Sequence, residues 1–217
     1  TSSTGMYAKY GELYNRATGV ITMSDTSTAM YGIDDSILEN AGEITIGKNT
    51  IAMYSEGSTT QGMKNTGTIK LPQTDSVAMS YNPDSALAAG VVVENAGNIE
   101  LSGDKNTAIY ATGTPTYKVK NNGTITINGI ESSGMAFAPG NLAGTTTTVF
   151  ENVGTIQDKN SGSNNTGMFA KKATSGAYDT INSGTITLGD SSSLGNPSVG
   201  MYTNTSVTGT NPLKNIG

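Results

Sequence analysis

Short runs of alternating apolar and polar residues recur along the whole chain. In the run 123–127 (GTITI), Ile125 and Ile127 alternate with threonine, and related runs follow most Asn-x-Gly triplets. This period of two predicts half-buried β-strands. A second short run precedes each Asn, as where Val93 is followed by Glu94 and Val119 by Lys120. A third run carries a Met, with a β-branched or small residue two places before it. None of these runs has helical spacing.

Two interleaved motifs repeat at intervals of about 23 to 33 residues, which is the spacing of a solenoid. The glycine of Asn-x-Gly-x-Ile-x-[Ile/Leu] falls at 19, 42, 67, 97, 123, 154, 184 and 217, and a small residue, Met and an aromatic residue form the second motif. Strands of four or five residues need stacked copies to close a core. We therefore expect an all-β fold, a right-handed parallel β-helix with three short strands per rung and about eight rungs.

Other repeat architectures fit these intervals less well. Leucine-rich repeats and calcium-binding repeats have signatures that the chain lacks, and propeller blades require four strands in about 40 residues. The last unit stops within its motif, at 215–217. We therefore expect residues 1–217 to be a single β-helix segment, truncated at both ends from a longer array.

The recurrent Asn is predicted to be a structural corner of the coil. The chain turns sharply between the second and third strands, and Asn and Gly enter left-handed backbone conformations at little cost. Stacked Asn side chains also form amide hydrogen-bond ladders. Two units deviate, because Thr180 and Asp158 occupy places that are apolar elsewhere. The predicted corner residues are Asn40, Asn65, Asn95, Asn121, Asn152, Asn182 and Asn215.

Variation in length is concentrated in the half-unit that runs from Met to the next corner Gly. Insertions in solenoids form loops along one edge, which is often the binding edge. The competing explanation is that these loops vary because nothing constrains them. The inserts are 82–90, 112–118, 139–148, 171–178 and 203–212. Candidate binding residues within them are Pro83, Asp84, Pro115, Tyr117, Asn141, Leu142, Lys171, Lys172 and Tyr178.

An aromatic residue follows most of the repeated Met positions. Side chains of successive strand residues point to opposite faces, so if Met points inward, this column faces solvent. Such rings stabilise neighbouring rungs by stacking, or form a platform for carbohydrate. Tyr81 and Phe137 stand one place later than the pattern requires. The column consists of Tyr7, Tyr31, Tyr54, Tyr110, Phe169 and Tyr202.

Composition narrows the function classes. Of 217 residues 13% are charged, the net charge is −5 and Arg16 is the single Arg, so the chain has no basic footprint for nucleic acid. No apolar run reaches the ~18 residues that span a bilayer, so this segment is not expected to insert into a membrane. Without Cys or His the chain lacks thiolate chemistry, the usual general base and the commonest metal ligand.

No catalytic constellation is visible in the sequence. A glycosidase needs two facing carboxylates, and a lyase needs basic residues beside clustered acids. The one adjacent acidic pair, Asp34-Asp35, has no basic neighbour, and the other acidic residues are scattered. No metal-ligand spacing or phosphate-binding loop is present. We expect no enzymatic activity, no cofactor and no metal. The scattered acidic positions include Glu43, Glu94, Glu100, Glu131 and Glu151.

The interleaved motifs, from 5–8 (GMYA) to 215–217 (NIG), resemble the passenger repeats of large fusobacterial type V autotransporter adhesins. That resemblance covers essentially the whole chain. It implies a surface-exposed β-helix, anchored in the outer membrane through a translocator barrel that this chain lacks. It also implies attachment to host-cell receptor proteins, glycans or other bacteria. The alternatives are a structural stalk that displays a distal binding domain and, less favoured, a polysaccharide lyase or hydrolase.

Overall fold

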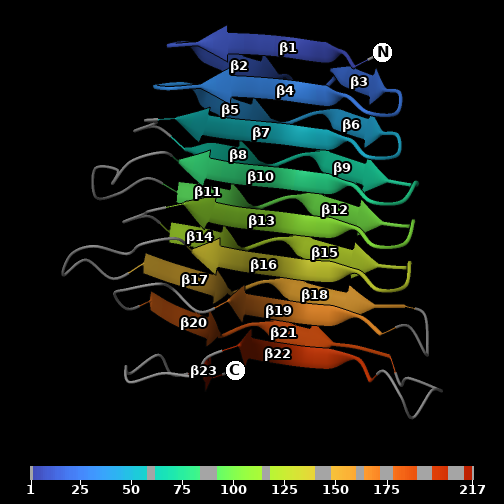
Figure 1. The fold of residues 1–217 in the computed structure, drawn as a ribbon, viewed down its shortest axis with the longest axis vertical. Coiled ribbons are helices and arrows are strands. Elements are labelled where there is room, and N and C mark those ends of the chain that lie inside the picture. The colour runs from blue at the N-terminus through green and yellow to red at the C-terminus, as the bar shows by residue number, and fades with distance from the viewer. Residues whose placement is uncertain are drawn as a thin grey trace.

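The computed structural model describes residues 2–57, 62–83, 92–113, 118–139, 148–159, 164–171, 178–189, 197–204 and 213–216. Within these ranges the regular structure consists of short β-strands, and no helix is present. The strands pair in parallel and form three sheets around a single rod (Figure 1). The predicted all-β parallel solenoid is confirmed.

Each sheet collects every third strand of the chain. Sheet A holds β1 (Thr4–Lys9), β4 (Thr28–Ile33), β7 (Ile51–Gly57), β10 (Val77–Pro83), β13 (Thr107–Gly113), β16 (Ser133–Pro139), β19 (Thr166–Lys171) and β22 (Val199–Asn204). Sheet B holds β2 (Glu12–Asn15), β5 (Ile37–Asn40), β8 (Met63–Asn65), β11 (Val92–Asn95), β14 (Lys118–Asn121), β17 (Thr148–Asn152), β20 (Tyr178–Asn182) and β23 (Leu213–Asn215). Sheet C holds β3 (Val20–Met23), β6 (Glu43–Ile46), β9 (Thr68–Leu71), β12 (Asn98–Leu101), β15 (Thr124–Ile127), β18 (Thr155–Asp158) and β21 (Thr185–Thr187).

One rung is one strand from each sheet, in the order A, B, C. Two sheets have eight strands and the third has seven, so seven described rungs are complete and the count differs slightly from the expected eight. From the N-terminus the chain runs right to left along the near sheet and left to right behind it as it descends (Figure 1). That path is right-handed, as parallel crossovers almost always are.

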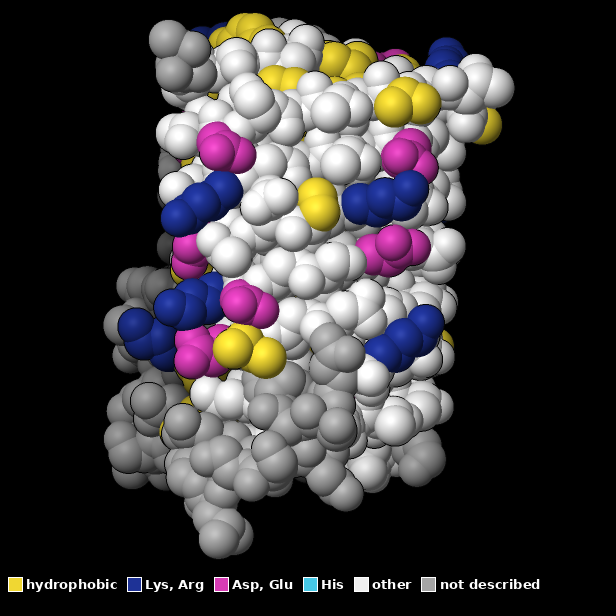
Figure 2. All heavy atoms as spheres, turned by 90° about the vertical axis from the view of Figure 1, so that its right-hand side faces the viewer, with side chains coloured by type: hydrophobic (Ala, Val, Ile, Leu, Met, Phe, Trp, Pro, Cys, Tyr) yellow, Lys and Arg dark blue, Asp and Glu magenta, His cyan; other side chains and the backbone are white. Residues whose placement is uncertain are grey.

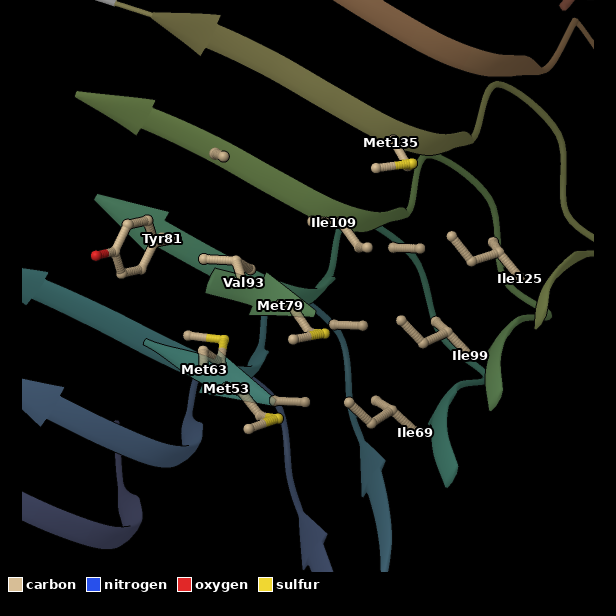
Figure 3. Packing of buried hydrophobic residues seen from close by; sticks show 14 of the residues in the cluster. Met53, Met63, Ile69, Met79, Tyr81, Val93, Ile99, Ile109, Ile125 and Met135 are labelled. Atoms are coloured by element: carbon tan, nitrogen blue, oxygen red, sulfur yellow. The ribbon is translucent and has the colours of Figure 1, made fainter. Parts of the chain in front are cut away.

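The core is built from columns of equivalent residues. Met53 pairs in register with Met79, and Ile99 pairs with Ile69 and Ile125. Because side chains alternate between the two faces of a strand, one residue in two points into the rod and is buried there. Figure 3 shows the Met column of sheet A and the Ile column of sheet C facing each other across the interior. Each rung therefore buries its apolar residues against its own three strands and against the rungs above and below.

A continuous ladder of Asn side chains, buried in every rung except the last, runs along the corner between sheets B and C. In each step the Nδ2 of one Asn donates to the Oδ1 of the Asn in the next rung, at 2.7 to 2.8 Å. In most rungs Nδ2 also donates to a glycine carbonyl two residues later, for example from Asn95 to Gly97 at 3.3 Å. The predicted ladder is confirmed. Its members are Asn15, Asn40, Asn65, Asn95, Asn121, Asn152, Asn182 and Asn215.

The expected left-handed conformation at this corner is wrong. None of its described Asn or Gly residues has a positive φ. Its glycines are required by close stacking instead, because a Cβ on Gly97 would lie 2.1 Å from the carbonyl oxygen of Gly67 in the preceding rung. A Cβ on Gly123 would meet the Gly97 oxygen at the same distance. The glycine column thus lets consecutive corners approach each other.

Six left-handed residues lie at the corner between sheets C and A, and four others, Tyr10, Asp34, Gly57 and Gly62, lie where sheet A leads into sheet B. Each of the six at the corner between sheets C and A is followed by a buried hydroxyl or amide side chain, and five of these side chains, all but Ser27, accept a hydrogen bond from a backbone N–H of the preceding rung. Ser76 N donates to Asn106 Oδ1 at 2.8 Å, and Asn106 N donates to Ser132 Oγ at 3.1 Å. This second polar ladder satisfies backbone donors that the turn leaves unpaired. The left-handed positions of this corner are Thr26, Asn49, Asp75, Lys105, Glu131 and Asn164, with φ between 49° and 59°.

We expect Asn95→Ala to destabilise the rod strongly. The substitution removes two buried bonds, leaving Asn65 Nδ2 without its acceptor and Asn121 Oδ1 without its donor. Buried polar groups without partners cost about 1 to 3 kcal/mol each, so the free energy of unfolding should fall by about 2 to 4 kcal/mol. Urea unfolding followed by circular dichroism measures this change.

The matched control is Asn122→Ala, at the residue that directly follows Asn121 of the ladder at the same corner. The Asn122 side chain is exposed and donates to Glu94 on the surface. Its removal should change the free energy of unfolding by no more than about 0.5 kcal/mol. Equal effects of the two substitutions would contradict a stabilising role for the buried ladder.

Candidate functional site

The inserts identified in the sequence share one edge of the rod. Each of the five connects a strand of sheet A to the following strand of sheet B. For example, β10 ends at Pro83 and β11 begins at Val92, whereas β16 ends at Pro139 and β17 begins at Thr148. Because strands of one sheet are stacked in register, these connections leave and re-enter the rod one above another. We call this corner the insert edge.

The structure describes three of the nine candidate binding residues. Lys171 is exposed at the end of β19, as a surface residue should be. Pro83 is buried at the end of β10, where it pairs in register with Gly57. The remaining six, Asp84, Pro115, Tyr117, Asn141, Leu142 and Lys172, lie outside the described residues.

The prediction that Tyr178 belongs to a surface binding loop is wrong. Tyr178 is the first residue of β20 and is 1% exposed. Its ring packs edge-on against Phe137 at a centroid distance of 5.1 Å, and its hydroxyl donates to the Lys171 carbonyl oxygen at 2.9 Å. It shares the inward parity of Thr180 and Asn182, two and four places later. Tyr178 therefore closes the core beneath the insert edge.

The aromatic column lies on the outer face of sheet A. The Met residues beside it are buried, or partly buried at Met6 and Met201 in the end rungs, whereas Tyr7 and Tyr202 are 55% and 47% exposed. Tyr31 stacks on Tyr54 at 5.3 Å, and Phe169 stacks on Tyr202 at 5.7 Å. The predicted outward direction is confirmed, and rings of adjacent rungs contact each other towards both ends of the rod. Stacked rings cover each other's faces, which favours the stabilising role over a carbohydrate platform.

The two displaced aromatics have the opposite direction. Ser80 and Ala136 occupy the outward positions of their rungs, and Tyr81 and Phe137 follow them with inward parity, each 0% exposed. Between these two rungs the equivalent inward place is held by Ala111. Because Ala111 is small, it leaves space in the core for the large rings of Tyr81 and Phe137 in the adjacent rungs. The displacement thus moves an aromatic side chain from the surface into the core.

Glu56 joins two rings of the outer column and was not singled out from the sequence. The hydroxyl of Tyr54 donates to its Oε2 at 2.6 Å, and the hydroxyl of Tyr31 donates to its Oε1. Burial, followed by this bond to Glu56, raises the pKa of Tyr31 well above its usual value. The available signal was an acid two places after Tyr54, on the same face of β7. The hydroxyl groups of Tyr31 and Tyr54 in this column are therefore hydrogen-bonded within the molecule.

Six ion pairs join charged side chains of neighbouring rungs. The distances run from 2.7 to 3.8 Å, and most of the side chains are substantially exposed. Figure 2 shows the result on one face, where acidic and basic side chains alternate down the rod among uncharged polar residues. The pairs are Lys9–Asp34, Lys64–Glu94, Lys70–Glu43, Lys105–Glu131, Lys120–Glu151 and Lys214–Asp179.

The arrangement of the described residues has two further features. In these ranges no group of three or more His, Cys, Asp or Glu side chains is placed to hold a metal ion. The described part of the chain also contains no helix with the length and apolarity of a membrane span.

A family model, described as the BigA third pectate lyase-like domain, matches residues 78–213, which is well over half of the chain. No curated protein and no solved structure is significantly similar to the chain. The matched region contains the insert edge from β10 onward and part of each polar ladder.

We expect Tyr81→Phe to reduce the loss of stability at alkaline pH. Burial raises the pKa of Tyr81 above the value of about 10 that it has in the unfolded chain. The folded state therefore keeps this proton where the unfolded state releases it. The stability from this difference is fully present below pH 10 and is lost as the pH rises through the folded pKa.

Urea unfolding at a series of pH values from about 8 to about 11 measures this slope for the parent and the variant. The free energy of unfolding of the parent should fall more steeply with pH than that of Tyr81→Phe. Tyr202→Phe is the control because Tyr202 is 47% exposed, and it should keep the parental slope. Parallel slopes for parent and Tyr81→Phe would contradict the prediction.

Proposed function

The chain belongs to the family of the BigA third pectate lyase-like domain, and from this premise we propose that it is an adhesive segment of a surface-exposed passenger domain. BigA is an autotransporter-type adhesin, and such a family fits a passenger segment. We further propose that the insert edge makes the contact with a host-cell receptor protein, a glycan or the surface of another bacterium. In the complete protein, a translocator barrel outside this chain anchors the passenger to the outer membrane.

The observation that carries this proposal is that five inserts share one corner of the rod, whereas the corner between sheets C and A is lengthened only from β18 to β19 and from β21 to β22. The strands on either side keep their register, as where Lys118 pairs with Val149 across an insert. Residues of successive inserts are thus brought to one edge without disturbing the core. Solenoids commonly bind partners through loops that line one edge in this way.

A structural stalk is the second candidate. It is supported by the two polar ladders and by the ion pairs that neutralise charge within the outer faces. A rod of this kind holds a distal domain away from the cell whether or not its own edge binds anything. The two candidates differ in whether the isolated, folded chain binds a partner.

Binding by the purified chain separates the two candidates. We expect saturable binding to receptor-bearing cells or to members of a glycan array, and loss of that binding when 140–147 and 172–177 are replaced by short Gly-Ser links. This trimming spares Tyr178, Phe137 and the strands on both sides. Circular dichroism and the urea midpoint verify that the trimmed variant is folded.

The matched control shortens 190–196, a connection of similar length that runs from sheet C to sheet A and lies at another corner. It should bind as the parent does. If the folded parent binds neither cells nor glycans, the stalk is favoured. If the control loses binding as fully as the trimmed variant, the insert edge is not the contact.

We also propose that the chain acts without catalysis. The paired, outward-facing carboxylates do not provide two acids across a cleft, which glycoside hydrolysis requires. Incubation with polygalacturonate and with host glycosaminoglycans should produce neither unsaturated uronate absorbance nor new reducing ends. A pectate lyase serves as the positive control, and product formation that depends on the chain would overturn this proposal.

A further inference from the structure

The outer face of sheet B carries a column of alternating charge. In successive rungs the outward positions are Glu39, Lys64, Glu94, Lys120 and Glu151, which pair in register along the sheet. Lys64 Nζ lies 3.8 Å from Glu94 Oε2, and Lys120 Nζ lies 3.1 Å from Glu151 Oε2. These side chains remain partly exposed, so their outer surfaces are open to a partner.

A hollow lies beside this column, where Gly62 leaves a gap between Ile37 and Val92. The residues that follow these three, Leu38, Met63 and Val93, pair in register. Gly62 has φ of +91°, and a Cβ there would lie 2.3 Å from the Val92 carbonyl oxygen, so the position has no room for a side chain. The hollow is apolar at its floor and sides and is rimmed by the charges of the column.

We propose that two copies of this chain pair in antiparallel orientation through the outer faces of their B sheets. The two-fold axis lies between the two sheets, runs parallel to the strands and passes between β8 and β11. Rotation about it brings each outward column opposite the same column of the second copy and reverses the order of the rungs. Lys64 then faces Glu94 of the second copy, and Glu39 faces Lys120 of the second copy. Val92 of each copy enters the hollow at Gly62 of the other.

The alternation of charge makes this face complementary to itself only in the antiparallel orientation with an axis between two rungs. A parallel arrangement about an axis along the rod places each charge opposite its own copy. Moving the axis by one rung, to lie between β11 and β14, places Glu39 opposite Ile181. With the axis between β8 and β11, Tyr14 instead faces Glu151, so a phenol donor meets a carboxylate acceptor.

The expected association is weak and sensitive to salt. The face is one short strand wide, so it buries less than a standard protein interface of ~800 Å² per partner. Its exposed charges are screened at physiological ionic strength. We therefore expect a monomer–dimer equilibrium with a dissociation constant of the order of 100 μM at low salt. The inference goes beyond the proposed function, because it requires neither a receptor nor the insert edge.

Sedimentation velocity of the purified chain at low and high salt tests the pairing. The parent should dimerise with increasing concentration, and Lys64→Glu should weaken dimerisation at least about tenfold, because it places acids opposite each other twice. The double variant Lys64→Glu/Glu94→Lys should dimerise again. A mixture of the parent and the double variant should form no mixed dimer, because like charges then face each other.

The matched control is Lys70→Glu, which breaks the 2.7 Å pair with Glu43 on the outer face of sheet C. It should dimerise as the parent does. A parent that stays monomeric at all concentrations overturns the proposal. So does a Lys64→Glu variant that keeps parental dimerisation, or a control that loses it equally.

Cross-linking tests the orientation, and the absence of Cys from the chain makes single thiols unambiguous. Glu39→Cys mixed with Lys120→Cys should give a covalent dimer with a short bifunctional maleimide, whereas either variant alone should not. In the antiparallel pair two copies of position 39 lie three rungs apart, about 14 Å along the rod. Efficient cross-linking of Glu39→Cys alone would show a parallel arrangement and overturn the proposal.

Discussion

Parallel pairing of every strand with its equivalent one rung away is the constraint on which the rest of the structure depends. Neighbouring strands lie about 4.8 Å apart, so equivalent residues form columns whose members contact one another. A column stabilises the rod only if the residues that follow one another in it attract. Met, Ile and aromatic columns meet this condition by packing, and Asn meets it because one amide carries both donors and an acceptor. Lys and Glu meet it by alternating, as in the outer column of sheet B.

The same constraint explains which parts of the chain are free to vary. A residue within a strand is held by its neighbours above and below, so a change there affects three rungs. A connection without such neighbours tolerates added length. The corner between sheets B and C carries both the Asn ladder and the tightly stacked glycines, and it keeps one length in every described rung except the first, which has two more residues there. The longer inserts occur where sheet A leads into sheet B and, from β18 to β19 and from β21 to β22, where sheet C leads into sheet A.

Much of this fold could be predicted because a residue type that recurs once per repeat in the sequence forms a column in the rod. The three strands per rung, the inward Met and the Asn ladder followed from residue spacing alone. Asn15 was missed because its glycine stands four places later, in Asn-Arg-Ala-Thr-Gly, instead of two. The second polar ladder was also missed, although a Ser, Thr or Asn stands three places before each Met, as Ser76 does before Met79. Its hydroxyls accept bonds from the backbone, which no side-chain pattern shows.

The errors at the candidate site have a common physical cause. Where an insert ends and a strand begins depends on which residue first finds a place in the core. Tyr178 was assigned to a loop as the last residue of the insert 171–178, yet its ring packs against Phe137, which in turn stacks on Phe150. Thr180, two places later, is too small to fill the apolar position that Phe150 fills in the preceding rung. The large ring at 178 thus accompanies a small residue at 180, and the boundary of the insert follows from the volume of the core.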